Sequence, residues 1–328
     1  MSGFAPGAMG MLAPIQALLE DQAISEILIN KPGEVFYEKE GKLLAISVPL
    51  FTEIHLYHLF QLIASESEQM LSEEQPLLSA SLSDGSRVQC VLPPTAAYPT
   101  LSIRRKVVRH LSLSDYEQTN FFQHTVLTDD QHCEQTLISL YQQRNWASFI
   151  RTAIDAKKNI IISGGTSSGK TTFLTACLRH IAQDQRVILL EDTREIDIPH
   201  PNQVQLLASK GGQGKAQVTM QDLVQCCLRL RPDRIICGEI RGKEILDFLA
   251  AGSTGHEGSM TSIHANNPKI AFMRMVQMYK LNNVPSMSDD DIMRELKAVI
   301  DVIIQLAKTP HGRCITSVYY RECDLSCC

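Results

Sequence analysis

Hydrophobic and polar positions follow two different patterns along the chain. Before residue 106, short apolar runs that are typical of strands alternate with turn residues and with two segments of helical spacing. The strand-like runs are 26–29, 35–37, 77–82, 87–92 and 100–105, and the helical segments are 14–23 and 52–69. Asp84-Gly85 is typical of a tight hairpin turn between two of these runs. The first half therefore predicts a small α+β domain.

From Ile160 onwards, apolar strands alternate with helical segments. The strand-like runs are 160–162, 187–190 and 235–237, and the first helical segment is 169–182. This alternation predicts an α/β domain, in which helices cover both faces of a parallel sheet. Near the end, Ser288 is a helix cap followed by three aspartates that suit the helix dipole. Residues 299–307 and 314–320 predict a terminal hairpin.

The segment between the two halves is more polar and only weakly periodic. We expect an N-terminal domain at 1–120, a linker at 121–145 and a second domain at 146–328. Within the linker, residues 134–142 predict a helix. Asn145 is a candidate cap for another helix that begins at Trp146.

Composition excludes several classes of protein. The 328 residues are 44% apolar and 20% charged, which is typical of a soluble globular chain with two domains. The net charge of −5 includes no basic arm, so binding to nucleic acid through a cationic surface is disfavoured. No apolar run approaches the roughly 18 residues that span a bilayer, and the first basic residue is Lys31, so no signal peptide is expected. We expect a cytoplasmic protein.

A glycine-rich segment follows the first strand of the second half. Residues 164–171 match G-x-x-x-x-G-K-[ST] in full, between a strand and a helix. Consecutive backbone N–H groups and the helix N-terminus of such a loop bind phosphate. Lys170 is expected to reach the β- and γ-phosphates, and Thr171 to bind Mg²⁺. The nucleotide-binding residues are expected to be Gly164, Gly165, Thr166, Ser167, Ser168, Gly169, Lys170, Thr171 and Thr172.

Acidic residues follow the next strands. Glu191 ends one strand-like run, and Glu239 comes shortly after another. Because the carboxyl ends of parallel strands share one edge of a sheet, both are expected near the phosphate loop. One carboxylate can then hold the Mg²⁺ shell while the other polarises water for attack on the γ-phosphate. Asp192 and Glu195 are weaker candidates, and all four could instead cap helices or pair with nearby arginines.

Two histidines lie among small, polar, turn-forming residues after Glu239. They are His256 and His264. Zinc binding is disfavoured because His256-Glu257 lacks the second histidine of an H-E-x-x-H motif and no cysteine pair is near. Sensing or positioning the γ-phosphate is the better interpretation of both residues.

These motifs together carry a family resemblance. The phosphate loop, the acidic stretch 191–195, the run 230–242 and the two-histidine segment occur in this order within residues 164–272. They resemble the secretion ATPase superfamily, the hexameric motors of type II secretion, type IV secretion and pilus assembly. The Glu-Asp-Thr-Arg-Glu sequence at 191–195 is most similar to the VirB-operon traffic ATPases of type IV secretion. The N-terminal half resembles the family less. Its matches are the hairpin after Ile29-Asn30 and the segments 84–87 and 102–104.

The resemblance implies a fold and a role for each motif. A RecA-like P-loop ATPase domain would follow a smaller PAS-like α+β domain, with ATP between them. Glu191 is similar to the family's candidate general base, and Gly238-Glu239 to its atypical Walker B motif. The implied catalytic residues are Glu191, Glu239, Lys170, His264 and His256, and the implied metal ligands are Thr171 and Glu239.

Arginines of the N-terminal domain are implied to contact the nucleotide. Arg104, and less clearly Arg87, are similar to family arginines that approach the phosphates and report domain closure. Arg241 is expected to act in the same way, within or between subunits. Two departures stand out: Ser168 replaces the glycine usual before Gly169, and the linker is longer than is typical.

The function that the resemblance implies is Mg²⁺-dependent ATP hydrolysis by a homohexamer that powers type IV secretion, by substrate translocation or pilus assembly. Expected partners are inner-membrane secretion components and a coupling ATPase, with peripheral membrane association and no sequence-specific nucleic-acid binding. The alternatives are a pilus assembly or retraction motor, a type II secretion motor, or a nucleotide-gated scaffold with incidental hydrolysis. The ten cysteines form no C-x-x-C pair, which weakens the type II assembly option. The cargo and the appendage stay open.

Overall fold

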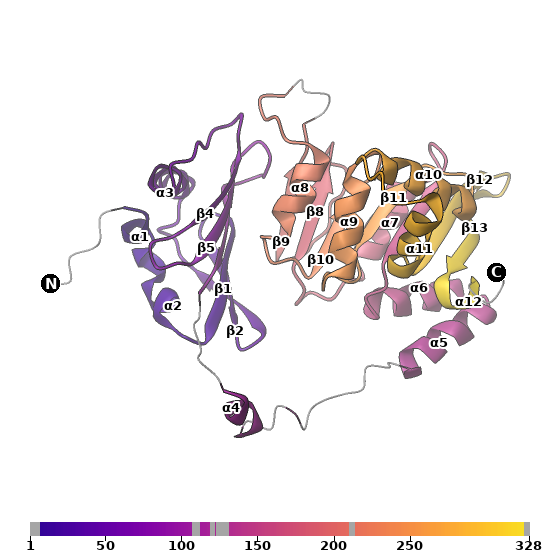
Figure 1. Ribbon diagram of the computed structural model, residues 1–328, viewed down its shortest axis with the longest axis horizontal. Coiled ribbons are helices and arrows are strands. Elements are labelled where there is room, and N and C mark those ends of the chain that lie inside the picture. Colours follow the sequence, from indigo (N-terminus) through magenta and orange to yellow (C-terminus); the bar gives the residue numbers. More distant parts are fainter. Residues whose placement is uncertain (1–6, 107–111, 119–121, 123–130, 210–213, 325–328) are drawn as a thin grey trace.

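The chain folds into two sheets that follow one another in sequence (Figure 1). The computed structural model describes residues 7–106, 112–118, 122, 131–209 and 214–324. The first sheet belongs to residues 24–104 and the second to residues 160–320. The predicted order, a smaller α+β domain before an α/β domain, is confirmed. The predicted boundaries at 120 and 145 stay predictions, because residues 119–121 and 123–130 lie outside the described part.

The first sheet has six antiparallel strands in the order β3-β2-β1-β6-β5-β4. The strands are β1 Ile24–Lys31, β2 Glu34–Lys39, β3 Lys42–Ser47, β4 Leu77–Ser81, β5 Arg87–Val91 and β6 Thr100–Arg104. The helices beside it are α1 Ala8–Met11, α2 Gln16–Glu20 and α3 Glu53–Glu66. Helix α3 buries Leu56, Leu59, Phe60 and Ile63 in the core of this domain, as its helical spacing predicts.

Two details of this domain differ from the sequence prediction. The helix expected at 14–23 is shorter, because a 3₁₀ turn at Ala13–Ile15 precedes α2 and the Asp21 carboxylate accepts a hydrogen bond from the N–H of Ala23 just beyond the helix. Strand β3 was not predicted, because it lies at the sheet edge and most of its side chains are exposed.

Three helices connect the sheets: α4 Leu113–Gln118, α5 Gln131–Gln142 and α6 Trp146–Asp155. Asn145 caps α6 by accepting a hydrogen bond from the N–H of Ser148 at 3.5 Å, as predicted. Helix α5 buries Leu137 against the second core. This part of the expected linker therefore packs with the second domain.

The second sheet has seven strands in the order β13-β12-β7-β11-β10-β8-β9. All neighbours are parallel except the edge strand β13. The strands are β7 Ile160–Gly164, β8 Val187–Glu191, β9 Gln203–Leu207, β10 Arg234–Cys237, β11 Met260–Ile263, β12 Val302–Thr309 and β13 Gly312–Tyr320. The helices are α7 Lys170–Leu178, α8 Met220–Cys227, α9 Glu244–Ser253, α10 Pro268–Lys280, α11 Asp289–Val299 and α12 Arg321–Asp324.

Helices cover both faces of this sheet, as the strand–helix alternation predicts. Ile160 and Ile162 of β7 pack with α5, α6 and α7, whereas Ile161 packs with α9, α10 and α11 on the opposite face. Ser288 caps α11 with a reciprocal capping box to Asp291, and β12 and β13 form the predicted hairpin. Within the described residues, no helix has the length and apolar character needed to cross a lipid bilayer.

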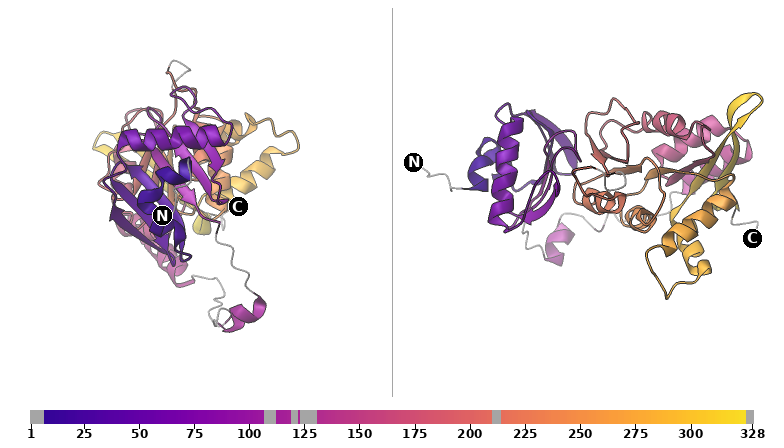
Figure 2. Two further views of the ribbon diagram at one scale, coloured as in Figure 1. Left: turned by 90° about the vertical axis from the view of Figure 1, so that its left-hand side faces the viewer. Right: turned by 90° about the horizontal axis from the view of Figure 1, so that it is seen from above.

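The first domain packs against β9, the edge strand of the second sheet (Figure 2). The N–H of Leu207 donates to the carbonyl of Thr95 at 2.7 Å, and Ala96 forms an antiparallel bridge with Leu206. Arg186 is fully buried at this junction and donates to the Oδ1 atom of Asn30 at 2.7 Å. The two domains therefore share an apolar and hydrogen-bonded interface four strands away from β7.

Candidate functional site

The phosphate loop leads from β7 into α7. Ser167 and Gly169 have φ angles of 59° and 92°, so the backbone turns through left-handed conformations between strand and helix. Glycine adopts such a conformation without strain, and Gly169 does so directly before Lys170. Gly164 is needed for space, because a Cβ atom there would lie 2.7 Å from the carbonyl oxygen of Leu306. The predicted motif thus has the tightly wound backbone that phosphate binding requires.

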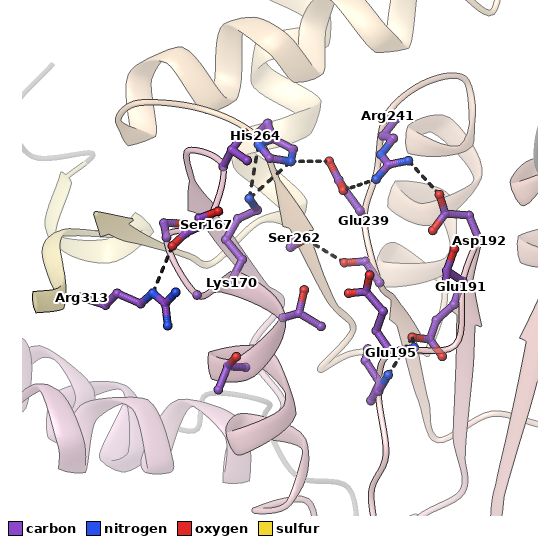
Figure 3. A pocket seen from close by; sticks show the side chains of 18 residues that line it. Ser167, Lys170, Glu191, Asp192, Glu195, Glu239, Arg241, Ser262, His264 and Arg313 are labelled. Carbon is purple, nitrogen blue, oxygen red and sulfur yellow. Dashed lines mark hydrogen bonds and ion pairs between the residues drawn. The ribbon is translucent and has the colours of Figure 1, made fainter. Parts of the chain in front are cut away.

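A pocket of about 400 Å³ opens above this loop (Figure 3). The phosphate-loop residues 166–172 form one side, and the segments after β8, β10 and β11 form the other. Among the residues that the structure describes, every lining residue comes from the second domain. The residues that line it are Thr166, Ser167, Ser168, Gly169, Lys170, Thr171, Thr172, Glu191, Asp192, Thr193, Glu195, Ile196, Gly238, Glu239, Arg241, Ser262, His264 and Arg313.

The strand order explains a chain of polar contacts across this pocket. Strand β11 lies between β7 and β10, so His264, just after β11, lies between Lys170 and Glu239. The Nζ atom of Lys170 is 3.3 Å from Nδ1 of His264, and Nε2 of His264 is 3.3 Å from Glu239. Burial lowers the pKa of His264 and outweighs the opposing effect of Glu239. A neutral imidazole can then accept from Lys170 and donate to Glu239.

Two further contacts extend this chain. Arg241 donates to Glu239 and to Asp192, each at 2.7 Å, so it joins the segments after β10 and β8. Lys170 also lies 3.1 Å from the carbonyl oxygen of Gly164, and burial lowers the pKa of its ammonium group. The loop carbonyls and His264 thus position Lys170 within the pocket.

Glu191 is held differently from the other carboxylates. Its Oε1 atom accepts hydrogen bonds from the backbone N–H groups of Glu195 at 3.0 Å and Ile196 at 2.9 Å. Its Oε2 atom is buried and has no partner among the described residues, although the residue is only 4% exposed. Burial raises the pKa of Glu191, with smaller opposing effects from the two N–H donors. A fixed carboxylate with one unsatisfied oxygen and a raised pKa has the properties of a general base.

The donor set also fits Mg²⁺, a metal that prefers oxygen ligands. The hydroxyl of Thr171 and the carboxylate of Glu239 line the same pocket, and both supply oxygen. With a nucleotide bound, Mg²⁺ would neutralise charge on the β- and γ-phosphate oxygens. The predicted metal ligands are therefore compatible with the geometry.

Three of the predicted residues lie elsewhere: Arg87, Arg104 and His256. Arg104 and His256 line a separate cleft of about 790 Å³ between the two domains, together with Arg87 and Arg229. Arg104 is the last residue of β6. Its Nε atom lies 3.6 Å from the carboxylate of Glu26, and its side chain is 74% exposed. The structure therefore does not bring Arg104 or His256 to the phosphate loop of their own chain.

Two contributors to the pocket were missed in the sequence analysis. Ser262 of β11 donates to the carbonyl of Gly238 at 2.7 Å, which joins β11 to the segment that carries Glu239. Arg313 of β13 donates to the carbonyl of Ser167 at 3.0 Å. Ser262 lies within the two-histidine segment but was not singled out, and Arg313 belongs to no recognised motif. Only the strand order shows that both lie beside the phosphate loop.

Comparison with known proteins agrees with this geometry. Residues 10–323 match the family described as Type II/IV secretion system protein. The type IV secretion system protein VirB11 of Brucella suis is 36% identical over 320 residues, covering 94% of this chain and 89% of that protein. VirB11 of Bartonella quintana is 34% identical, covering 94% of this chain and 91% of that protein.

A solved structure is similar over nearly the whole chain. It is the crystal structure of the VirB11 ATPase from the Brucella suis type IV secretion system in complex with sulphate, with a TM-score of 0.88 and 34% identity. The match covers 95% of this chain and 97% of that one, so both domains and their arrangement are shared. The resemblance seen in the motifs is confirmed. The chain belongs to the Type II/IV secretion system protein family, with the VirB11 proteins of type IV secretion among its full-length relatives.

Proposed function

We propose that this protein is a Mg²⁺-dependent ATP hydrolase that works as a hexameric motor of a type IV secretion system. The observation that carries the proposal is Glu191, whose buried, unsatisfied oxygen lines the same pocket as the phosphate loop. A nucleotide-binding scaffold needs the loop alone, whereas this carboxylate is suited to activating water. The VirB11 relatives support the choice of type IV secretion over a pilus or type II motor.

The main polar residues of the pocket take distinct roles in the proposed reaction. The phosphate-loop N–H groups and Lys170 would bind the phosphates, and Thr171 and Glu239 would hold Mg²⁺. Glu191 accepts a proton from the attacking water through its unpaired oxygen. His264 and Arg241 connect Lys170 to Glu239 and Asp192, so they respond to charge that appears or disappears at the γ-phosphate.

Arg104 and His256 act in this proposal on the nucleotide of a neighbouring subunit. Their cleft also contains Arg87 and Arg229, for which no ion pair is found within the described residues. Cations exposed at a cleft attract phosphate. Because the cleft lies apart from the phosphate loop of its own chain, a second copy of the chain must supply the nucleotide that these residues contact.

The finer cellular role follows from the relatives. We infer a homohexamer that associates peripherally with the bacterial inner membrane, where secretion components and a coupling ATPase are its partners. The motion of the ring would be used for substrate translocation, pilus assembly or both. No sequence-specific contact with nucleic acid is proposed.

Steady-state ATP hydrolysis across the size-exclusion profile of the purified protein tests the proposal. We expect Mg²⁺-dependent turnover in a ring-sized species, and at least about a 100-fold loss in the Lys170→Ala variant, because the phosphates lose their principal cation. Nucleotide bound without turnover in any wild-type species would contradict the motor and favour a nucleotide-gated scaffold.

A further inference from the structure

The terminal hairpin forms a wall of the nucleotide pocket. Strand β12 runs parallel to β7, and their registers pair Leu306 with Gly164, the last residue of β7. Strand β12 continues to Thr309, so the hairpin extends beyond the end of β7 on the side of the phosphate loop. Strand β13 returns with Arg313 opposite Lys308. The topology thus places a cation from the last strand beside a loop 146 residues earlier in the chain.

Arg313 is hydrogen-bonded to the phosphate loop at one residue and lies close to another. Its Nε atom donates to the carbonyl of Ser167 at 3.0 Å. Its Cδ atom would lie 3.1 Å from a Cβ atom added to Gly169. Ser167 and Gly169 are the two residues of the loop with left-handed φ angles, so Arg313 packs against the part of the loop with the least common backbone conformation.

The guanidinium group has further donors to offer. An arginine carries five N–H donors, and the contact with Ser167 uses the one on Nε. In the described part of the chain no carboxylate forms an ion pair with Arg313. The residue is exposed and lines the pocket, and Figure 3 shows it beside Ser167. Its terminal N–H groups are therefore available to an anion that enters the pocket.

The acidic residues lie on the opposite side of the pocket. Glu191 is the last residue of β8 and Glu239 follows β10, whereas Arg313 belongs to the hairpin beyond β7 (Figure 3). Hydrolysis requires the γ-phosphate to lie toward Glu191 and the Mg²⁺ ligands. The remaining phosphates of the nucleotide then lie on the side of the loop that Arg313 contacts.

We propose that Arg313 is a nucleotide-binding residue that contacts the α- and β-phosphates and holds the phosphate loop in shape through Ser167. The proposal rests on the ATP hydrolysis proposed above. A guanidinium suits this task because it can bind phosphate through two N–H groups while a third holds the loop carbonyl. Since ADP keeps both of these phosphates, Arg313 stabilises substrate and product alike and contributes to affinity rather than to the hydrolysis step.

The test measures nucleotide affinity and turnover in the Arg313→Ala variant of the full chain. We expect the Kd for ADP and the KM for ATP to rise about tenfold, with kcat within about twofold of wild type. The affinity of the variant for pyrophosphate, measured by competition with a fluorescent ADP analogue, should fall by a similar factor. Arg313→Lys retains part of the affinity because it keeps the charge but loses the planar group.

Lys308→Ala is the matched control. It removes one charge from the paired position of the same exposed hairpin, and Lys308 does not line the pocket, so ADP affinity should not change. Unchanged ADP affinity in Arg313→Ala overturns the proposal. A loss for ADP without a loss for pyrophosphate also overturns it, because the contact would then be to the base or ribose. A wild-type protein that binds neither nucleotide would instead contradict the proposed function.

Discussion

The nucleotide pocket and the interdomain cleft are built from the same kinds of residue and differ in how those residues are satisfied. Each contains arginine, histidine and a buried glutamate whose pKa is raised by burial, Glu191 in the pocket and Glu26 in the cleft. Glu191 is fixed by two backbone N–H groups and keeps one oxygen unpaired, whereas Glu26 faces the cation of Arg104.

The backbone around each glutamate explains this difference. The pocket lies where parallel strands end and a glycine-rich loop exposes N–H groups, so it can bind a charged substrate. The cleft lies between two domains, and its Arg231 is already paired with Glu38 at 2.5 Å and Asp233 at 2.9 Å. Residue type alone therefore does not distinguish the two regions, whereas the unpaired buried carboxylate oxygen of Glu191 does.

Apart from substitution of Glu191, the largest loss of activity is expected for Glu239→Gln in the pocket. The change removes a proposed metal ligand and weakens the contacts to His264 and Arg241, so kcat should fall by about 10²- to 10³-fold. The Mg²⁺ concentration for half-maximal rate should rise, while ATP affinity without Mg²⁺ changes less than about threefold. Steady-state kinetics over a Mg²⁺ titration checks this, with Glu53→Gln on the exposed start of α3 as the control. A normal Mg²⁺ dependence would contradict the assignment.

Mixing two inactive variants sharpens the contrast between pocket and cleft. Lys170→Ala chains lack a working pocket but keep Arg104, and Arg104→Ala chains have the reverse defect. If Arg104 serves a neighbouring pocket, rings that contain both variants restore some competent sites. We expect the mixture to hydrolyse ATP several-fold faster than the average of the two variants. A rate equal to that average would show that Arg104 does not act across the subunit boundary.

Loss of the ion pairs of Arg231 in the cleft should lower the stability of the protein. Arg231→Ala leaves Glu38 and Asp233 without their shared partner at a partly buried position, which should lower the free energy of unfolding by about 2–4 kcal/mol. Denaturant unfolding followed by circular dichroism measures the change. Lys170→Ala provides the comparison from the pocket, where a change below about 1 kcal/mol is expected. Equal destabilisation by the two variants would remove the distinction between the regions.

A smaller, pH-dependent effect is expected from Glu26. Burial raises its pKa to about 7, against the opposing influence of Arg104 and Arg231. The folded state therefore favours the protonated carboxyl, so the stability this group contributes is complete below about pH 4.5 and is lost as the pH rises through about 7. Glu26→Gln should remove this loss and make the protein up to about 3 kcal/mol more stable than wild type at pH 8. Denaturant unfolding at pH 5 and pH 8 measures this effect. The same difference in the free energy of unfolding between the two proteins at both pH values would contradict the prediction.

Local patterns allowed much of the pocket to be predicted. The phosphate loop follows β7, Glu191 ends β8 and Glu239 comes just after β10, so a short stretch of sequence contains both the apolar strand and its functional residue. Strand β11 was not assigned as a strand, because it has four residues and its centre is Thr261-Ser262 rather than an apolar run. The position of His264 between Lys170 and Glu239 therefore became clear only from the strand order.

Long-range relations account for what was not predicted. Arg313 reaches the pocket because β12 pairs with β7 across more than 130 residues, which no local spacing indicates. Arg104 and His256 were expected beside the phosphates because their motifs resemble those of the family, and a motif does not say which chain supplies its ligand. Within one chain, the packing of the first domain against β9 leaves Arg104 and His256 in the interdomain cleft, away from the phosphate loop.

The most direct test of the account is the Glu191→Gln variant, because Glu191 is the proposed general base and a nucleotide-binding scaffold would not need one. We predict that kcat falls at least about 100-fold while the Kd for ATP stays within about threefold, because glutamine fills the same space without accepting a proton. Since burial raises the pKa of Glu191, the wild-type rate should fall on acidification at a higher pH than an ordinary glutamate would require. Wild-type turnover in Glu191→Gln, with an unchanged pH profile, would contradict the account.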